Sequence, residues 1–125
     1  MFISTSNVKQ VMKRIEAFVQ SERTSMVVDA IKTAGVGGLT VLSGKGQGHG
    51  QRPQIEVSRG TKRQTAEYNW IDTIITIVDD SKADAIVTAI VDAASTGSKG
   101  DGKIFVSTIE NVIDIGSKQK GASAL

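Results

Sequence analysis

Apolar and polar positions follow two different periods in the first half of the chain, one after the other. Residues 12–19 place Ile15 and Val19 on one side of an imperfect two-residue alternation, which is typical of a strand. In the next segment apolar residues recur at helical spacing, so we expect a helix over about 22–34 that buries one side. The apolar run of residues 38–44 predicts a second strand.

The second half of the chain repeats this order. Residues 70–78 are rich in β-branched side chains and predict a strand. A helix start is expected at Ser81, and apolar residues at helical spacing continue from there to Ala94. A strand near residues 103–108 and a short last strand near 112–115 complete the pattern.

Two strand–helix–strand units that share one sheet indicate an α+β fold, a ferredoxin-like sandwich built from a double βαβ repeat. The strings at 27–30 (VVDA) and 90–93 (IVDA) are near copies and agree with an internal duplication. Right-handed crossovers place both helices on one face of the sheet. The other face stays uncovered although the strands are apolar on both sides in places, so we expect self-association to cover it.

Composition excludes most catalytic chemistry. The chain has 125 residues, which is one domain by length, with no cysteine and a single histidine, His49. Disulfides, thiolate metal sites and a Ser-His-Asp or Cys-His set are therefore excluded, and we expect neither catalytic nor metal-binding residues. No apolar run approaches the ~20 residues of a membrane span, and the N-terminus lacks the order of a signal peptide, so a cytoplasmic protein is expected.

The segment between the two halves, residues 43–69, stands out by its length and composition. It contains five glycines and Pro53, and a structureless connection of this length is usually functional. The net charge of the chain is only +2, but between Lys45 and Arg63 basic residues gather against a single acid, Glu56. They are Lys45, Arg52, Arg59, Lys62 and Arg63. We expect the segment to attract anions, carried by phosphates, carboxylates or an acidic protein surface.

The sharpest motif is the turn between the second helix and the next strand, TGSKGDGKIFV from Thr96 to Val106. Its glycines permit close approach of the backbone, and Lys103 supplies a positive charge where a strand begins, which suits phosphate binding. From spacing alone, an ordinary turn with a solvated lysine is the more common interpretation. Glycines at every second position from Gly44 to Gly50 likewise allow backbone N–H groups to approach an anion.

The same string resembles the C-terminal signature of the PII nitrogen regulatory proteins, T-G-x-x-G-D-G-K-I-F-V, at every specified position. The resemblance extends over nearly the whole chain from Met12. Residues 35–40 resemble the second strand of the family, and Gly46 and Gly48 resemble the base of its long T-loop. The resemblance implies a single PII-type domain over 1–125, with an N-terminal extension (1–11), a T-loop at about 44–69 and a flexible tail (116–125).

Members of this family are homotrimers that bind ATP or ADP between subunits, and many bind 2-oxoglutarate at the T-loop base through magnesium. They regulate ammonium transporters, nitrogen-assimilation enzymes or transcription factors. The resemblance therefore implies a sensor of 2-oxoglutarate, adenine nucleotides or both, and not an enzyme, that acts allosterically through its T-loop. The ligand-binding residues that it implies are Thr40, Gly46, Gln47, Gly48, His49, Gly50, Gln51, Lys99, Gly100, Asp101, Gly102 and Lys103. The implied partner-binding residues are Arg59, Lys62 and Arg63.

The chain departs from the family at positions that bind phosphates, magnesium and 2-oxoglutarate. Two arginines of the last strand fall at Asp114 and Gly116, and the magnesium-binding glutamine is replaced by Gly50. The lysine that pairs with 2-oxoglutarate falls at or near Trp70, and the tyrosine that some members carry for uridylylation falls near Arg63. Two lost charge-assisted bonds of roughly 1.5–3 kcal/mol each would weaken ATP binding about a hundredfold to ten-thousandfold.

We therefore expect an atypical member with weak ATP binding, no obligatory cofactor and no magnesium requirement. The alternative is a PII-like sensor of AMP, ADP or another small anion that regulates carbon or other metabolism. A nucleic-acid-binding domain of the same fold is disfavoured, because the strands lack the exposed aromatic pairs that stack on bases.

Several residues have plainer interpretations that stay open at this point. His49 is more often a solvated or hydrogen-bonding loop residue than a ligand contact, and residues 59–63 are most often a solvated loop tip. We expect Trp70 to pack at a strand start or a subunit contact. Phe18 and Phe105 are expected in the core.

Overall fold

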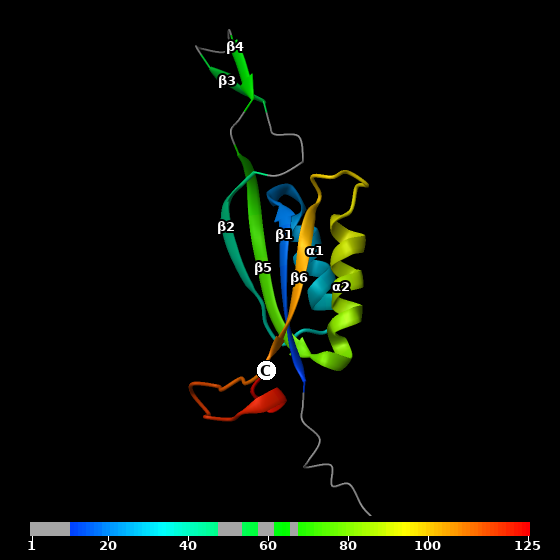
Figure 1. Ribbon diagram of the computed structural model, residues 1–125, viewed down its shortest axis with the longest axis vertical. Helices are drawn as coiled ribbons and strands as arrows, with labels where there is room; N and C mark the ends of the chain where they lie inside the picture. Colours follow the sequence, from blue (N-terminus) through cyan, green and yellow to red (C-terminus); the bar gives the residue numbers. More distant parts are fainter. Residues whose placement is uncertain (1–10, 48–53, 58–61, 66–67) are drawn as a thin grey trace, which may run out of the picture.

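The computed structural model describes residues 11–47, 54–57, 62–65 and 68–125, with only the backbone described for 54–57 and 62–65 (Figure 1). The strands are β1 (Met12–Gln20), β2 (Thr40–Gly46), β3 (Gln54–Val57), β4 (Lys62–Thr65), β5 (Asn69–Asp79) and β6 (Gly102–Ile109). The helices are α1 (Thr24–Thr33) and α2 (Asp80–Ala94), with short 3₁₀-helices at Ser21–Arg23 and Gly121–Ala124. Apart from Val11, the expected N-terminal extension lies outside the described residues.

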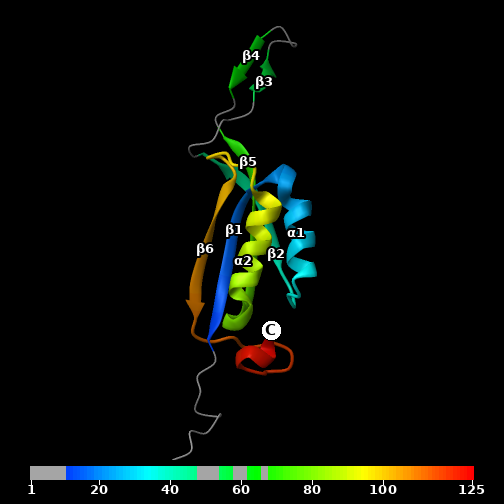
Figure 2. The ribbon, with the colours of Figure 1, turned by 90° about the vertical axis from the view of Figure 1, so that its right-hand side faces the viewer.

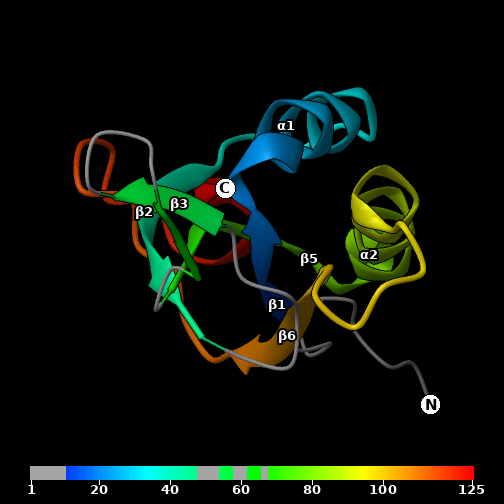
Figure 3. The same cartoon turned by 90° about the horizontal axis from the view of Figure 1, so that it is seen from above.

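Four strands form one sheet in the order β2-β5-β1-β6, and all neighbours are antiparallel. The two strands that follow a helix connection, β2 and β6, occupy the two edges of this sheet. Both helices lie against the same face, as the view from above shows (Figure 3). The predicted α+β ferredoxin-like sandwich is therefore confirmed.

The core fills the space between the helices and that face of the sheet. Its apolar side chains come from every second position of β1 and β5 and from one side of each helix, as the two periodicities of the sequence predicted. Ile15, Ile31 and Ile86 are completely buried there. Full burial of an isoleucine contributes about 1.5–3 kcal/mol relative to exposure, so this layer holds the sandwich together.

Helix α2 begins directly at the end of β5, because Asp79 ends the strand in extended conformation and caps the helix. The Asp79 carboxylate accepts a hydrogen bond from the backbone N–H of Ser81 at 3.0 Å and another from the Ser81 hydroxyl. These bonds lower the pKa of Asp79. The helix start was expected at Ser81, so the true cap lies two residues earlier.

A buried carboxylate ties the start of α1 to the sheet. Asp72 of β5 is almost completely buried and accepts a hydrogen bond from the Thr24 hydroxyl at 2.6 Å and a longer one from the Ser21 hydroxyl at 3.4 Å. The bond from Thr24 is the main cause that lowers the pKa of Asp72, with further hydroxyl bonds from Ser43 and Ser21. A buried charge of this kind stabilises the fold only while its partners are in place.

The second face of the sheet, which we call the open face, carries apolar side chains that no helix covers. Phe18 of β1 and Phe105 of β6 meet there edge to face, with ring centroids 5.7 Å apart. Phe105 is 53% exposed and Leu42 of β2 is 55% exposed. The expectation that Phe105 lies in the core of the single chain is therefore wrong, because alternation along β6 directs it away from the helices.

The end of the chain folds back on itself beyond β6. Only an isolated bridge between Ile113 and Lys120 forms where a short last strand was expected. The Asp114 carboxylate accepts hydrogen bonds from the backbone N–H of Ser117 at 2.7 Å and from its hydroxyl at 2.8 Å, which closes a turn. A 3₁₀-helix follows, so the segment expected as a flexible tail has a defined local structure.

The long segment between the halves contains secondary structure of its own. Strands β2 and β5 continue to Gly46 and Asn69, and β3 and β4 pair as an antiparallel hairpin beyond them. Figures 1 and 2 show this hairpin projecting past the end of the four-stranded sheet. The composition of this connection had suggested a structureless segment. Part of it instead forms strands.

Candidate functional site

The turn after α2 and the root of the long loop meet at one end of the sheet. A pocket of about 300 Å³ lies between them on the open face. We call it the loop-root pocket. Of its lining residues, those predicted from the sequence are Gly46, Gln47, Lys99, Gly100, Gly102 and Lys103. Segments more than fifty positions apart in the chain thus converge, because the last residues of β2 and the first residues of β6 lie at the same end of the sheet.

The walls of the pocket combine charge, amide groups and aromatic rings. Lys99 and Lys103 supply positive charge, and among the described residues neither of them forms an ion pair with an acid. Phe18 and Phe105 form an apolar wall. Such a pocket suits a small anion with an apolar portion, since ligand pockets are mostly apolar with a few convergent polar groups.

Asp101 fixes the shape of the turn. Its carboxylate accepts hydrogen bonds from the backbone N–H of Thr96 at 2.6 Å, from the Thr96 hydroxyl, and from the backbone N–H of Ser98 at 3.2 Å. The bonds from Thr96 are the main cause that lowers the pKa of Asp101. The sequence suggested Asp101 as a ligand-binding residue, but in the structure its carboxylate is engaged by the turn itself.

The backbone of the turn is occupied in the same way. The N–H of Gly100 donates to the Ser98 hydroxyl at 3.2 Å, and the N–H of Asp101 donates to the Ser98 carbonyl at 3.2 Å. The glycine spacing had suggested that backbone N–H groups of this turn hold a phosphate. The N–H groups of Gly100 and Asp101 already have partners and are not free for this role. The positive charge at the pocket comes instead from the side chains of Lys99 and Lys103.

Gly102 has a structural requirement for glycine. Its φ of +123° is rarely adopted by other residues, and a Cβ atom built on it would lie 1.9 Å from the carbonyl oxygen of Phe18. The glycine lets β6 begin in close contact with β1. Lys103, the next residue, is thereby placed directly opposite Phe18 in the sheet.

Two polar residues of the pocket, Gln20 and Asn69, were not predicted as site residues from the sequence. Gln20, at the end of β1, donates a hydrogen bond from Nε2 to the carbonyl oxygen of Gly100 at 2.6 Å and so ties the turn to the sheet. Asn69, at the start of β5, lines the pocket and is 6% exposed. Neither belongs to a motif, and only their position at a strand end would have marked them.

Other predicted residues lie elsewhere or are not described. Thr40 begins β2, six positions from Gly46, which is about 20 Å along a strand, and it does not line the loop-root pocket. Gly48, His49, Gly50, Gln51 and Arg59 lie outside the described residues. Lys62 and Arg63 belong to β4, where they pair with Val57 and Glu56 of β3, but their side chains are not described.

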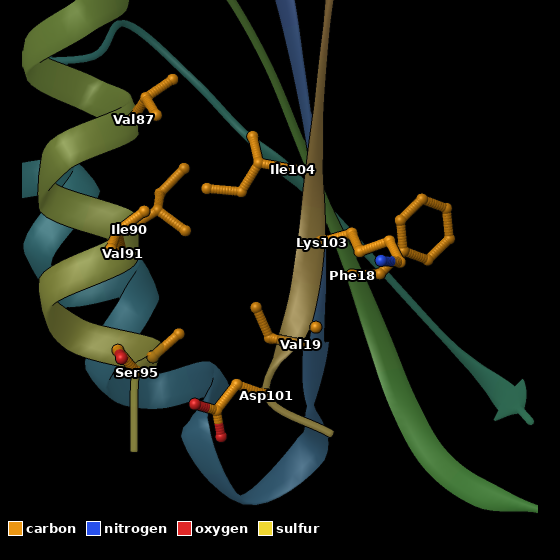
Figure 4. A pocket seen from close by; sticks show the side chains of 11 residues that line it. Phe18, Val19, Val87, Ile90, Val91, Ser95, Asp101, Lys103 and Ile104 are labelled. Atoms are coloured by element: carbon orange, nitrogen blue, oxygen red, sulfur yellow. The ribbon is translucent and has the colours of Figure 1, made fainter. Parts of the chain in front are cut away.

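A second, mostly apolar pocket of about 340 Å³ separates α2 from β6. Figure 4 shows Val87 and Ile90 of the helix facing Ile104 of the strand across it. In the same view Lys103 and Phe18 extend from the opposite side of the sheet, away from α2. The amine of Lys103 therefore belongs to the open face and its loop-root pocket.

Trp70 is not packed within the single chain, so of the two expected roles only a subunit contact stays open. It is 63% exposed, and the amine of Lys45 lies 5.4 Å from the centre of its ring, a cation–π contact between β5 and β2. Both residues lie on the opposite side of the sheet from Asn69, because neighbouring positions of a strand alternate.

Two kinds of site are not found in the described part of the chain. Its Asp and Glu residues form no group of three or more that could hold a metal ion, and its one histidine, His49, lies outside the described residues. None of its helices has the length and apolar character that a membrane span requires.

The fold and the site together define a ferredoxin-like α+β domain with a basic pocket at the root of a projecting loop. The family model for nitrogen regulatory protein P-II matches residues 12–119, and this chain belongs to that family. The P-II protein of Nostoc punctiforme is 38% identical over 114 residues, which cover 91% of this chain and all of that protein. The family consists of regulators, so the chain is a signalling protein and not an enzyme.

Solved structures agree with this assignment. The structure of Bacillus subtilis GlnK superposes with a TM-score of 0.72 at 29% sequence identity, covering 92% of this chain and 99% of the other. A complex of GlnK from the same organism with ATP gives a TM-score of 0.73 at 24% identity, covering 94% of this chain and all of the other. The second comparison supports the fold.

Proposed function

We propose that the chain assembles as a homotrimer, senses a small anionic effector in the loop-root pocket, and signals through the T-loop to a protein of nitrogen metabolism. The observation that carries the proposal is the convergence of Lys99 and Lys103 with Gly46 and Gln47. An effector bound there touches the root of the loop. The effector shifts the populations of the loop conformations, and the size of this shift is set by the difference in its affinity for those conformations.

The effectors that we propose are 2-oxoglutarate, ATP and ADP, singly or together. Two lysines with no acidic partner among the described residues favour an anion, and GlnK of B. subtilis forms a complex with ATP. We propose weak ATP binding here because Asp114 replaces a family arginine. Its lowered pKa keeps it negatively charged, and its bonds to Ser117 keep it in the closed turn.

Trimer formation is proposed from the open face. Phe105 and Leu42 are about half exposed there, on strands whose other face packs against the helices. Burying apolar surface at roughly 25 cal/mol per Å² is the usual driving force for such association. A trimer would also place the open side of each loop-root pocket next to a neighbouring subunit.

The proposed target is an ammonium transporter or a nitrogen-assimilation enzyme in the cytoplasm, reached by the projecting β3–β4 hairpin (Figure 2). Arg59, Lys62 and Arg63 are the proposed contacts, since they supply positive charge in β4 and just before it in the sequence. A second candidate is a sensor of AMP, ADP or another small anion in carbon or other metabolism. The modest pocket volume of about 300 Å³ favours a small effector of this kind.

Titration calorimetry with ATP, ADP, AMP and 2-oxoglutarate, each with and without magnesium, tests the proposal. We expect binding of at least one of these anions, with ATP weaker than micromolar and indifferent to magnesium. Sub-micromolar binding of magnesium-ATP would overturn the proposed weak nucleotide site. If none of the four binds, the sensor function is wrong. Capture of a transporter or enzyme from native extract, changed by 2-oxoglutarate, tests the signalling step.

A further inference from the structure

Asn69 is a largely buried amide at the wall of the loop-root pocket. It begins β5, is 6% exposed and lines the pocket. Polar side chains buried to this degree are almost always hydrogen-bonded, and an amide at a pocket wall can donate to or accept from a molecule bound there.

The strand register places Asn69 on the same face as the lysine of the signature turn. Asn69 and Thr73 share one face of β5 because they are separated by an even number of positions. Thr73 is directly opposite Phe18 of β1, and Phe18 is directly opposite Lys103 of β6. The amide and the amine therefore approach the pocket from the same side of the sheet.

The lysines and the Asn69 amide suit different parts of a ligand. Lys99 and Lys103 attract the charged end of a ligand, while the uncharged amide of Asn69 offers two donors and one acceptor to a neutral polar group. Glu16, the acid on this face of β1, pairs with Arg14 at 3.4 Å, and among the described residues no acid forms an ion pair with Lys99 or Lys103. The volume of about 300 Å³ corresponds to about ten water molecules, which suits a ligand of few atoms.

We propose that Asn69 determines specificity by hydrogen bonding to an uncharged oxygen of a small organic anion whose carboxylates face Lys99 and Lys103. The inference rests on the proposed function, because it names what the effector pocket recognises. It assigns the selectivity between anions of the same charge to Asn69, and the overall affinity for anions to the lysines.

Two probes that differ by one oxygen test the assignment. 2-Oxoglutarate and glutarate carry the same two carboxylates, but glutarate lacks the keto oxygen. By titration calorimetry we expect the wild-type protein to bind 2-oxoglutarate about tenfold more tightly than glutarate. In Asn69→Ala the two affinities become equal through loss of 2-oxoglutarate binding alone. In Lys103→Ala both affinities fall by the same factor, tenfold or more.

Matched variants separate recognition from folding. Asn111→Ala removes an exposed asparagine beyond the end of β6 and should leave the preference intact. Asn69→Ser places a hydroxyl where the amide was and should retain a few-fold preference for 2-oxoglutarate over glutarate. This variant tests the role of Asn69 if Asn69→Ala unfolds. Thermal melting of each variant is recorded alongside.

The outcomes separate the role of Asn69 from the sensor function. A preference that survives in Asn69→Ala, or a wild-type protein that binds both diacids equally, overturns the role of Asn69 and leaves the sensor function standing. Failure of the wild-type protein to bind either diacid also overturns it. The sensor function itself falls only if ATP, ADP and AMP fail as well.

Discussion

Replacement of Gly102 by alanine should be among the most damaging single changes in the signature turn. The new Cβ would lie 1.9 Å from the Phe18 carbonyl oxygen and 3.0 Å from its carbonyl carbon, both backbone atoms that no rotamer change can move. The positive φ adds strain of about 1–2 kcal/mol. Separation of β6 from β1 at this point would also lose a ladder hydrogen bond, at about 1 kcal/mol.

The expected loss of unfolding free energy for Gly102→Ala is therefore about 3 kcal/mol or more. Two other glycines provide matched controls. Gly97 has a φ of +83° but nothing within 4 Å of the position that a Cβ would take, so Gly97→Ala should cost only the strain, about 1–2 kcal/mol. Gly38 has neither a positive φ nor a close neighbour, so Gly38→Ala should change stability by less than about 1 kcal/mol.

Urea unfolding followed by circular dichroism measures all three, at one fixed protein concentration because oligomer stability depends on it. The order Gly38→Ala, Gly97→Ala, Gly102→Ala in rising cost is the expected result. Equal stability of the Gly97 and Gly102 variants would show that the β6 backbone does not approach Phe18 so closely. The proposed reason for glycine at position 102, close contact of β6 with the Phe18 backbone, would then be wrong.

Further predictions concern the buried carboxylate, the pocket and the open face. The pKa of Asp72 is lowered in the folded state, so its contribution to stability is present above about pH 4 and is lost as the pH falls further. Urea unfolding between pH 7 and pH 2.5 should show a smaller loss for Asp72→Asn than for the wild-type protein, and equal slopes would contradict the assignment. Gln20→Ala leaves the Gly100 carbonyl without its donor and should lower the unfolding free energy by about 1 kcal/mol, measured against Gln119→Ala as an exposed control. Phe105→Glu should convert a trimer to monomers in light scattering, and an unchanged mass would argue that the open face is not the interface.

The sequence alone determined the order and type of nearly all elements. Periodicity is a local property: one side of a helix or strand is apolar wherever that side is buried, and this is why the elements around Ile15 and Ile86 were predicted correctly. Two βαβ units with right-handed crossovers allow few arrangements, so the fold class followed as well. The signature turn pointed to its family because its glycines and lysine stand at fixed spacings.

Only the tertiary structure decided which polar groups face the pocket and which close their own turns. Asp101 and Asp114 are bound by neighbouring N–H and hydroxyl groups, a result of turn geometry that composition does not show. Gln20 and Asn69 lie far apart in the chain and meet at the pocket because β1 and β5 pair in one register. Side-chain alternation fixes two faces for a strand, but packing of the helices decides which face is the core, and so Phe105 is exposed.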